Sequence, residues 1–175
     1  MWSGDSTTTP DELQECVAAS GIDVLCVTDH NAIRGAIELA EQLPCRVIVG
    51  EELKTHAGEI IGLFLTERIP QGIRPEEAAR NIREQGGIVY VPHPFDPIRN
   101  NLRSDVLDEL VGLDLVDGIE VLNGKTSLKS LNKKASDYAS EHDLAIGAGS
   151  DAHVAEAIGA AYMQMPDFDN PADFL

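Results

Sequence analysis

The chain is poor in basic residues, and this shortage limits the partners it can bind. Its 175 residues include 13 Lys and Arg against 30 Asp and Glu, which gives a formal net charge of −17. Nonspecific binding to nucleic acid depends on clustered Lys and Arg, so long duplex nucleic acid is not an expected partner. A small phosphorylated substrate is compatible with this charge, because bound divalent cations would reverse the local field.

Paired cysteines and long apolar runs are also missing. Cys16, Cys26 and Cys45 are far apart and form no Cys-x-x-Cys motif. They are therefore expected to be buried, reduced, structural thiols. No apolar stretch approaches the length that spans a membrane, and the N-terminus lacks a signal-peptide pattern. These features predict a cytoplasmic protein that does not bind membranes.

Helix and strand patterns alternate along the chain. Thr9 and Glu12 have the spacing of a capping box, Pro10 suits a first helical turn, and Gly21 marks a helix end. Apolar stripes and short apolar runs define the later elements. The predicted strands are 23–27, 46–49, 59–65, 88–91, 118–122, 145–149 and 161–165, and the predicted helices are 10–20, 33–43, 75–85, 105–111 and 128–139.

This alternation predicts an α/β fold with a parallel sheet. Six or seven strand–helix units favour a barrel over an open sheet, although the chain is short beside the ~250 residues usual for a (β/α)8 barrel. No linker divides residues 1–175, so we expect a single domain. No strand precedes the first helix, and residues 170–175 begin a helix that stops. The barrel is therefore expected to be incomplete at its first strand and at its C-terminal helix.

Side chains that bind metals follow several predicted strands. They are Asp29 and His30, Glu51 and Glu52, His93, and Asp151 and His153. Because the carboxyl ends of parallel strands meet at one edge of a barrel, we expect these side chains to lie close together. A mixture of carboxylates and imidazoles suits divalent metals, so the sequence predicts a metal site at this edge.

Four segments resemble, in order, the motifs of the PHP (polymerase and histidinol phosphatase) family. They are Thr28–Asn31, Gly50–Glu52, Val91–Pro94 and Gly149–His153. Any one motif is weak, but their order and approximate spacing fit the family over nearly the whole chain. The resemblance implies a distorted (β/α)7 TIM-like barrel that holds up to three divalent metals, Zn, Mn, Mg or Fe, and hydrolyses phosphoesters.

The resemblance also implies the metal ligands. Glu52 would bridge two metals, and Asp151 would bind one of them. His93 would bind the other, with Glu59 in the place where many members have a His. The third metal would be held by Asp5, His30 and His153.

Other residues would support these ligands. Asp29 is expected to orient a neighbouring imidazole, because ligating His residues usually donate their second N–H to a carboxylate or carbonyl. Asn123 and Glu120 stand where the family often has another ligand or a supporting group. Glu51 and Glu52 face opposite ways in an extended strand, so Glu51 is expected to be a solvated or capping carboxylate.

The implied chemistry is attack on a phosphoester by a metal-activated water. Catalysis would rest on Glu52 and Asp151, with Arg99 and Lys125 as candidate cations for the phosphate. For each cation, an ordinary surface position is the alternative. The substrate would be a small phosphomonoester, a nucleotide or an oligonucleotide end.

One motif of the family is absent. PHP proteins begin with His-x-His, and residues 1–6 look like the loop that follows it. One metal site would then keep only Glu52 and Asp151, so we expect fewer metals than in an intact site and weak or no activity in this form. A longer natural form is the simplest explanation. Two alternatives remain open: a non-catalytic PHP-like scaffold or regulatory domain, and an amidohydrolase-like C–N hydrolase.

Overall fold

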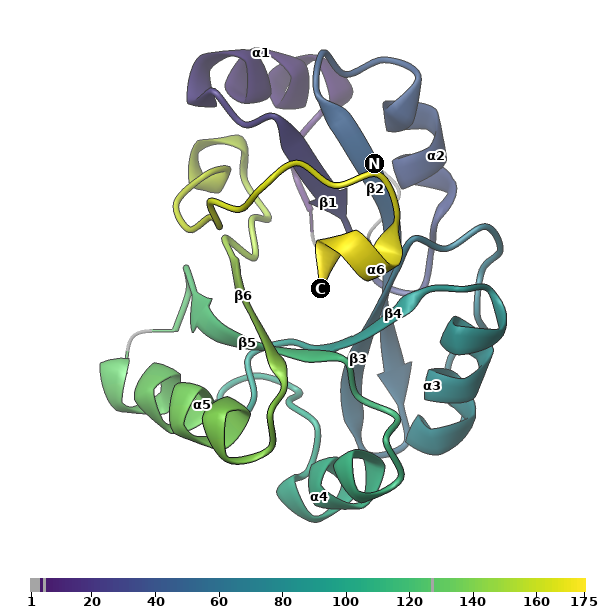
Figure 1. Cartoon of the computed structure of the whole chain (residues 1–175). Helices are drawn as coiled ribbons and strands as arrows, with labels where there is room; N and C mark the ends of the chain where they lie inside the picture. The colour runs from purple at the N-terminus through teal and green to yellow at the C-terminus, as the bar shows by residue number, and fades with distance from the viewer. Residues whose placement is uncertain (1–3, 5, 127) are drawn as a thin grey trace.

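The computed structural model describes residue 4, residues 6–126 and residues 128–175. Helices and strands alternate along most of the chain (Figure 1). The elements are α1 (Pro10–Ser20), β1 (Val24–Val27), α2 (Arg34–Ala40), β2 (Arg46–Thr55), β3 (Gly58–Leu63), α3 (Pro75–Glu84), β4 (Ile88–Val91), α4 (Ser104–Gly112), β5 (Gly118–Asn123), α5 (Lys129–Glu141), β6 (Ala145–Gly149), the short 3-10 helix η1 (Ala155–Ala157) and α6 (Pro171–Phe174). The capping box predicted at the start of α1 is present.

The six strands form one curled sheet in the order in which they occur in the chain, so the fold is a mixed α/β half-barrel. Strands β1 and β2, β4 and β5, and β5 and β6 pair in parallel. Strand β3 is antiparallel to both of its neighbours, so the prediction of an all-parallel sheet is wrong at this strand. The physical reason is the short link between Thr55 and Gly58, which makes a hairpin and leaves no room for a crossover helix.

The predicted strand at 161–165 is also wrong. These residues form no strand, and the segment continues to Phe168 and Phe174, which pack against the inner face of the sheet. The ring of Phe168 lies 4.9 Å from that of Phe174 and 4.5 Å from the Arg46 guanidinium. Arg46 also donates a hydrogen bond to the Phe168 carbonyl, at 2.6 Å. The C-terminal segment therefore covers the end of the half-barrel at which β2 begins, with α6 in the middle of the view in Figure 1.

The two faces of the sheet have different neighbours. The outer face packs against α3, α4 and α5 through a large apolar core that includes Ile60, Ile82 and Leu107. The inner face carries a smaller apolar cluster that includes Ile48, Ile61 and Ile88. Since side chains alternate along a strand, Glu52 lies on the same inner face as Ile48, four residues earlier in β2.

The cysteine prediction is only partly correct. All three thiols are free, but Cys26 is exposed and Cys16 and Cys45 are half-buried. Cys26 lies on β1, which pairs with β2 alone among the described strands, so one edge of β1 is open. Within the described residues, no helix is both long enough and apolar enough to cross a membrane.

Gly58, at the β2–β3 turn, provides a test of how closely this turn packs against the backbone of residues 101–102. Its φ is 122°, and an added Cβ would lie 2.3 Å from the Asn101 carbonyl oxygen and 2.5 Å from Leu102 Cα. Both are backbone atoms and cannot rotate away. We expect Gly58→Ala to lower the free energy of unfolding by roughly 2–4 kcal/mol in chemical denaturation.

Gly72→Ala is the matched control. Gly72 has a φ of 72°, but no atom lies within 4 Å of its added Cβ. Backbone strain alone predicts a loss of about 1 kcal/mol. Equal losses for the two variants would contradict the close approach of the 101–102 backbone.

Candidate metal centre

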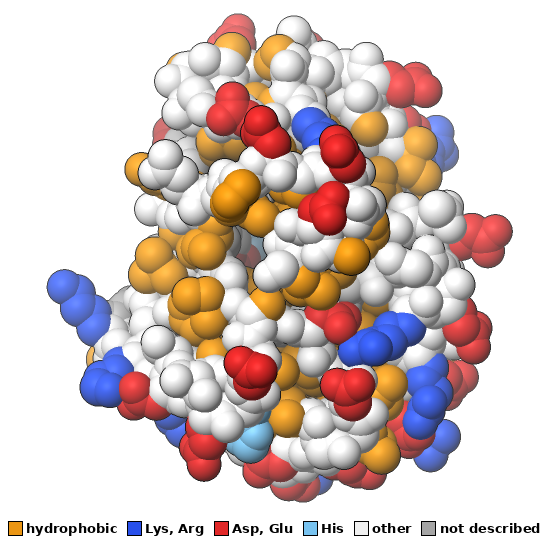
Figure 2. Space-filling model, in the orientation of Figure 1, with side chains coloured by type: hydrophobic (Ala, Val, Ile, Leu, Met, Phe, Trp, Pro, Cys, Tyr) orange, Lys and Arg blue, Asp and Glu red, His pale blue; other side chains and the backbone are white. Residues whose placement is uncertain are grey.

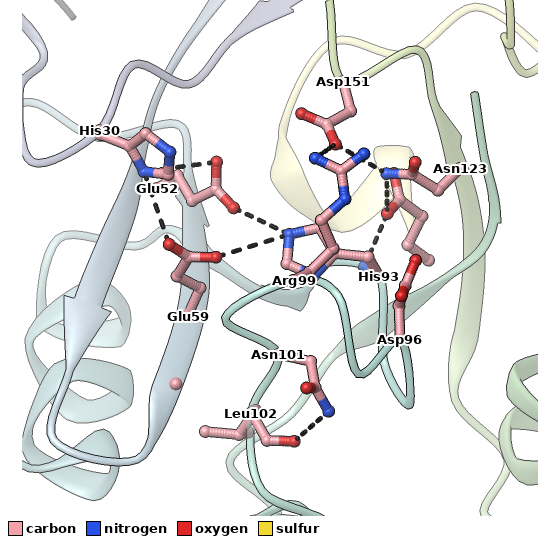
Figure 3. Close-up of polar contacts among 12 residues, drawn as sticks. His30, Glu52, Glu59, His93, Asp96, Arg99, Asn101, Leu102, Asn123 and Asp151 are labelled. Atoms are coloured by element: carbon pink, nitrogen blue, oxygen red, sulfur yellow. Dashed lines mark hydrogen bonds and ion pairs between the residues drawn. The ribbon is translucent and has the colours of Figure 1, made fainter. Parts of the chain in front are cut away.

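Four side chains from four segments converge on the inner face of the sheet (Figure 3). Glu52 pairs with Ile61 and Glu59 pairs with Lys54, so the two carboxylates are diagonal neighbours on one face of the β2–β3 hairpin. His30 follows β1, and its backbone pairs with that of Glu52. His93 follows β4. The reversed strand β3 thus begins at the edge where β1, β2 and β4 end, which is why Glu59 reaches this site.

The spacing of three of these groups, His30, Glu52 and Glu59, suits one divalent metal, and His93 lies beside both carboxylates. His30 Nδ1 lies 3.6 Å from Glu52 Oε2 and 3.8 Å from Glu59 Oε1. His93 Nε2 lies 3.2 Å from Glu52 Oε1 and 3.6 Å from Glu59 Oε2. Ligands around a tetrahedral ion with bonds of about 2.05 Å stand roughly 3.3 Å apart. The donor atoms of His30, Glu52 and Glu59 all lie within 4.8 Å of one another.

The electrostatics of the cluster also favour a cation. Burial raises the pKa of Glu59, and the nearby Glu52 carboxylate raises it further. Burial lowers the pKa of His93, but its hydrogen bond to Glu52 and the surrounding carboxylates outweigh this effect and raise it overall. The buried Nδ1 of His93 has no hydrogen-bond partner among the described residues. Two carboxylates at close range in a buried site are stabilised by a shared positive charge.

A second cluster is centred on Asp151, just after β6. Arg99 Nη1 lies 3.2 Å from Asp151 Oδ2, and Lys125 Nζ lies 3.4 Å from Asp151 Oδ1. Asn123 donates a hydrogen bond to Asp151 Oδ2 at 3.4 Å. Lys125 Nζ also contacts His153 Nδ1, which itself lies 3.4 Å from Asp151 Oδ1. The structure therefore brings both candidate phosphate cations to one carboxylate.

Glu120 joins the two clusters. Its Oε2 accepts hydrogen bonds from the His93 backbone N–H at 2.7 Å and from Asn123 Nδ2 at 3.0 Å. Burial raises the pKa of Glu120 to about 7. The ring of His153, in the second cluster, lies edge-on to that of His30, in the first, with centroids 6.4 Å apart. The two clusters are therefore neighbours at this point as well.

The remaining predicted residues have different positions. Asp5 lies outside the described residues. Asp29 follows β1, and its carbonyl accepts from the Glu52 N–H at 3.2 Å; its role in orienting an imidazole stays a prediction. Glu51 is fully buried on the outer face, where it accepts from the Ile69 N–H at 2.8 Å. Glu51 is thus a capping group for a loop, and the alternative of a solvated carboxylate is wrong.

Backbone strain at the site was not predicted. Asn31, His93 and Asp151 have φ values of 54°, 31° and 50°, in the left-handed region. Each such residue costs on the order of 1–3 kcal/mol and persists only where its surroundings hold it. Asn31 is held in part because its Oδ1 accepts from the Lys54 N–H at 3.0 Å. A sequence pattern carries little signal for these conformations.

Known proteins are similar to this chain in sequence and in fold. Residues 129–175 match the PHP-associated family (PHP_C). The uncharacterized proteins MJ1587 and MJ0417 of Methanocaldococcus jannaschii are 44% and 37% identical to the chain, over 68% and 91% of its length and 68% and 67% of theirs. The chain belongs to the PHP family. The PHP assignment rests on the match of residues 129–175 and on the fold, and the two uncharacterized relatives assign no substrate.

Solved structures share the fold of this PHP domain. A two-domain protein from Bacteroides vulgatus, which contains a predicted PHP-like metal-dependent phosphoesterase, has a TM-score of 0.70 and 22% identity. The match covers 87% of this chain, which spans about half (49%) of that protein. An amidohydrolase from Chromobacterium violaceum, solved with sulfate and no metal, has a TM-score of 0.71 and 19% identity, over 93% of this chain and 88% of its own.

Removal of one carboxylate charge tests the metal cluster of the PHP domain. Glu59→Gln keeps the shape of the side chain but removes one anionic donor. We expect metal affinity to fall on the order of 10-fold or more, as measured by competition with a chelating indicator. Glu84→Gln, at an exposed position on α3, is the control. Unchanged affinity in Glu59→Gln would rule out Glu59 as a ligand.

The raised pKa of Glu120 predicts a pH-dependent stability. A carboxyl whose pKa is about 7 in the folded protein, against an ordinary value of 4.5, binds its proton more tightly when folded. Stability should therefore fall as pH rises from about 4.5 to 7. In metal-free buffer, Glu120→Gln should raise the free energy of unfolding at pH 8 by up to about 3 kcal/mol, with little gain at pH 5. Denaturant titrations of both proteins at the two pH values measure this, and a pH-independent difference would contradict it.

Proposed function

We propose that this PHP domain is a metal-dependent phosphoesterase that acts on small phosphomonoesters. The observation that supports this most strongly is the position of a metal-ligand cluster beside a pair of cations. His93 belongs to the first cluster, Arg99 to the second, and both come from the loop after β4. Glu120 is hydrogen-bonded to residues of both. A phosphoryl group needs such a combination of charges to be bound and attacked.

The metal half of the site would consist of His30, Glu52, Glu59 and His93. These residues would hold a divalent ion, whose chemistry would be to offset the charge of a phosphoryl group and to lower the pKa of a water molecule. The chain itself keeps the four donors in place through the β2–β3 ladder and through the Asn31 N–H, which donates to the Glu52 carbonyl at 3.0 Å. A ligand set of two carboxylates and two imidazoles accommodates Zn, Mn or Fe.

The anion half would consist of Arg99 and Lys125. Each reaches a different oxygen of Asp151, so the two positive charges lie on either side of one carboxylate. A phosphate monoester carries nearly two negative charges at neutral pH, and two converging cations match this charge. A phosphodiester carries one. The cation pair therefore favours a monoester as the substrate.

The surface charge supports a small substrate. Acidic side chains are spread over the face shown in Figure 2, in keeping with the net charge of −17. Long duplex nucleic acid would be repelled over most of such a surface. We propose a phosphorylated metabolite, nucleotide or oligonucleotide end as the partner, with divalent cations screening the site itself.

Phosphate release from p-nitrophenyl phosphate and nucleoside monophosphates tests this function. We expect turnover that is weak in this form, because the His-x-His motif is absent, that requires added Mn, Zn or Mg, and that is abolished by a chelator and by Glu52→Gln. Arg99→Gln should raise KM by roughly 10-fold, because the charge and the paired N–H donors that the guanidinium would offer a phosphate are lost. Ile98→Ala is the control in the same loop, since the Ile98 side chain is 83% exposed.

The outcomes separate the alternatives. Metal binding without turnover of any substrate would favour a non-catalytic PHP-like domain. Hydrolysis of amides or lactones with indifference to phosphate esters would favour a C–N hydrolase. Equal KM values for Arg99→Gln and the unchanged protein would contradict the anion half of the proposal.

A further inference from the structure

Asp96 is a buried carboxylate that the sequence did not single out. It lies in the loop after β4, between His93 and Arg99, and only 4% of its surface is exposed. Burying a carboxylate is costly unless its oxygens are hydrogen-bonded. Its partners therefore indicate its role.

Both carboxylate oxygens of Asp96 are used. Oδ1 accepts from the Ile98 N–H at 3.0 Å, and Oδ2 accepts from the Thr126 hydroxyl at 2.9 Å. The Asp96 carbonyl accepts from the Arg99 N–H at 3.1 Å. Asp96 thus holds the turn that carries Arg99 and, through the Thr126 hydroxyl, reaches the residue next to Lys125.

The loop of Lys125 is held in a similar way. The N–H groups of Lys125 and Thr126 both donate to Asn123 Oδ1, at 2.8 and 3.1 Å. The hydrogen bond between Asp96 and Thr126 joins this turn to the turn of Arg99, 30 residues apart in sequence. It therefore links the backbones from which the two cations extend to Asp151.

The rest of the Arg99 loop is anchored from outside. The Phe95 ring packs against Tyr138 of α5 with centroids 5.5 Å apart, and Lys134 Nζ lies 4.0 Å from the Phe95 centroid. These contacts fix the loop to α5 but not to the turn of Lys125. Loss of the Asp96–Thr126 bond would leave the loop folded and joined to the turn of Lys125 only at its His93 end, through Glu120 and Asn123, so the separation of the two cations would be less firmly fixed.

We propose that Asp96 and Thr126 are positioning residues that make Arg99 and Lys125 bind one phosphate together. Two long, flexible side chains grip one anion well only when their backbones are held at a fixed separation. This inference rests on the proposed function, because it assigns phosphate to the two cations. It also gives the site a means of selecting doubly charged groups, because a group with a single negative charge is bound less tightly by two cations held at a fixed separation.

The test uses Thr126→Val, which removes the hydroxyl at nearly constant volume, and Thr126→Ser, which keeps it. The measurement is the affinity of the metal-loaded chain for inorganic phosphate, together with kcat and KM for the phosphomonoester. Thr126→Val should weaken phosphate binding and raise KM roughly 3- to 10-fold with kcat nearly unchanged, as expected for one hydrogen bond. Thr126→Ser should retain the affinity of the unchanged protein.

Tyr138→Phe provides a control for stability alone. It removes a 2.8 Å hydrogen bond from α5 to Asp108 of the neighbouring helix α4 and keeps the ring that packs on Phe95 of the Arg99 loop. It should lower stability without changing phosphate affinity. A change in phosphate affinity of the size seen in Thr126→Val would show that loop stability, and not the spacing of the cations, is the cause.

The remaining outcomes are distinguishable. If the unchanged protein hydrolyses phosphomonoesters and Arg99→Gln weakens phosphate binding, but Thr126→Val does not, the inference is wrong and the proposed function stands. If Arg99→Gln leaves phosphate affinity unchanged, the cations do not bind phosphate and the inference is wrong. If the metal-loaded protein neither binds phosphate nor turns over the esters, both proposals are wrong.

Discussion

Repulsion between two buried carboxylates is the constraint on which the site depends. Glu52 and Glu59 lie on one face of the β2–β3 hairpin, largely shielded from water, and neither can leave without breaking the ladder that positions it. Imidazoles reach both carboxylates, His30 from one side and His93 from the other. The strained backbone at Asn31 and His93 is the local cost of this arrangement.

At Asp151 the signs of the charges are reversed. Here one carboxylate is opposed by Arg99 and Lys125, so the local excess of charge is positive. The two clusters therefore have opposite electrostatic character although they share the backbone between His93 and Arg99. Glu120, buried between them and bonded to both, keeps these regions at a constant separation. A substrate with an anionic group and an ester oxygen would meet a different charge at each end.

Much of this architecture could be predicted from the sequence, because local signals agree with the fold. The capping box of α1 and the apolar runs of β4 and β6 coincide with the observed elements. The grouping of His30, Glu52 and His93 followed from their positions after apolar runs. The direction of β3 did not, because β2 continues from Glu51 to Thr55, a stretch in which Leu53 alone is apolar, so that apolar periodicity gives no signal there.

Other features depend on long-range contacts that periodicity does not encode. The segment 161–165 has a strand-like composition but pairs with none of the described strands, and Phe168, just after it, packs into the inner apolar cluster. The convergence of Arg99 and Lys125 on Asp151 requires two loops to meet, and neither loop carries a pattern for this. Asp96 was missed for the same reason, since its partner Thr126 is distant in sequence.

The hairpin has a consequence for how the protein reaches its native state. Glu52 and Glu59 are close in sequence and share one two-stranded unit, whereas His30 and His93 come from segments on either side of it. Hairpins form within about 1–10 μs, and contacts between distant segments form later. The contact between the two carboxylates is thus the most local one in the cluster, and those with His93 are the least local. During synthesis His30 emerges before the hairpin and His93 after it, so the His93 side of the cluster is the last to be completed.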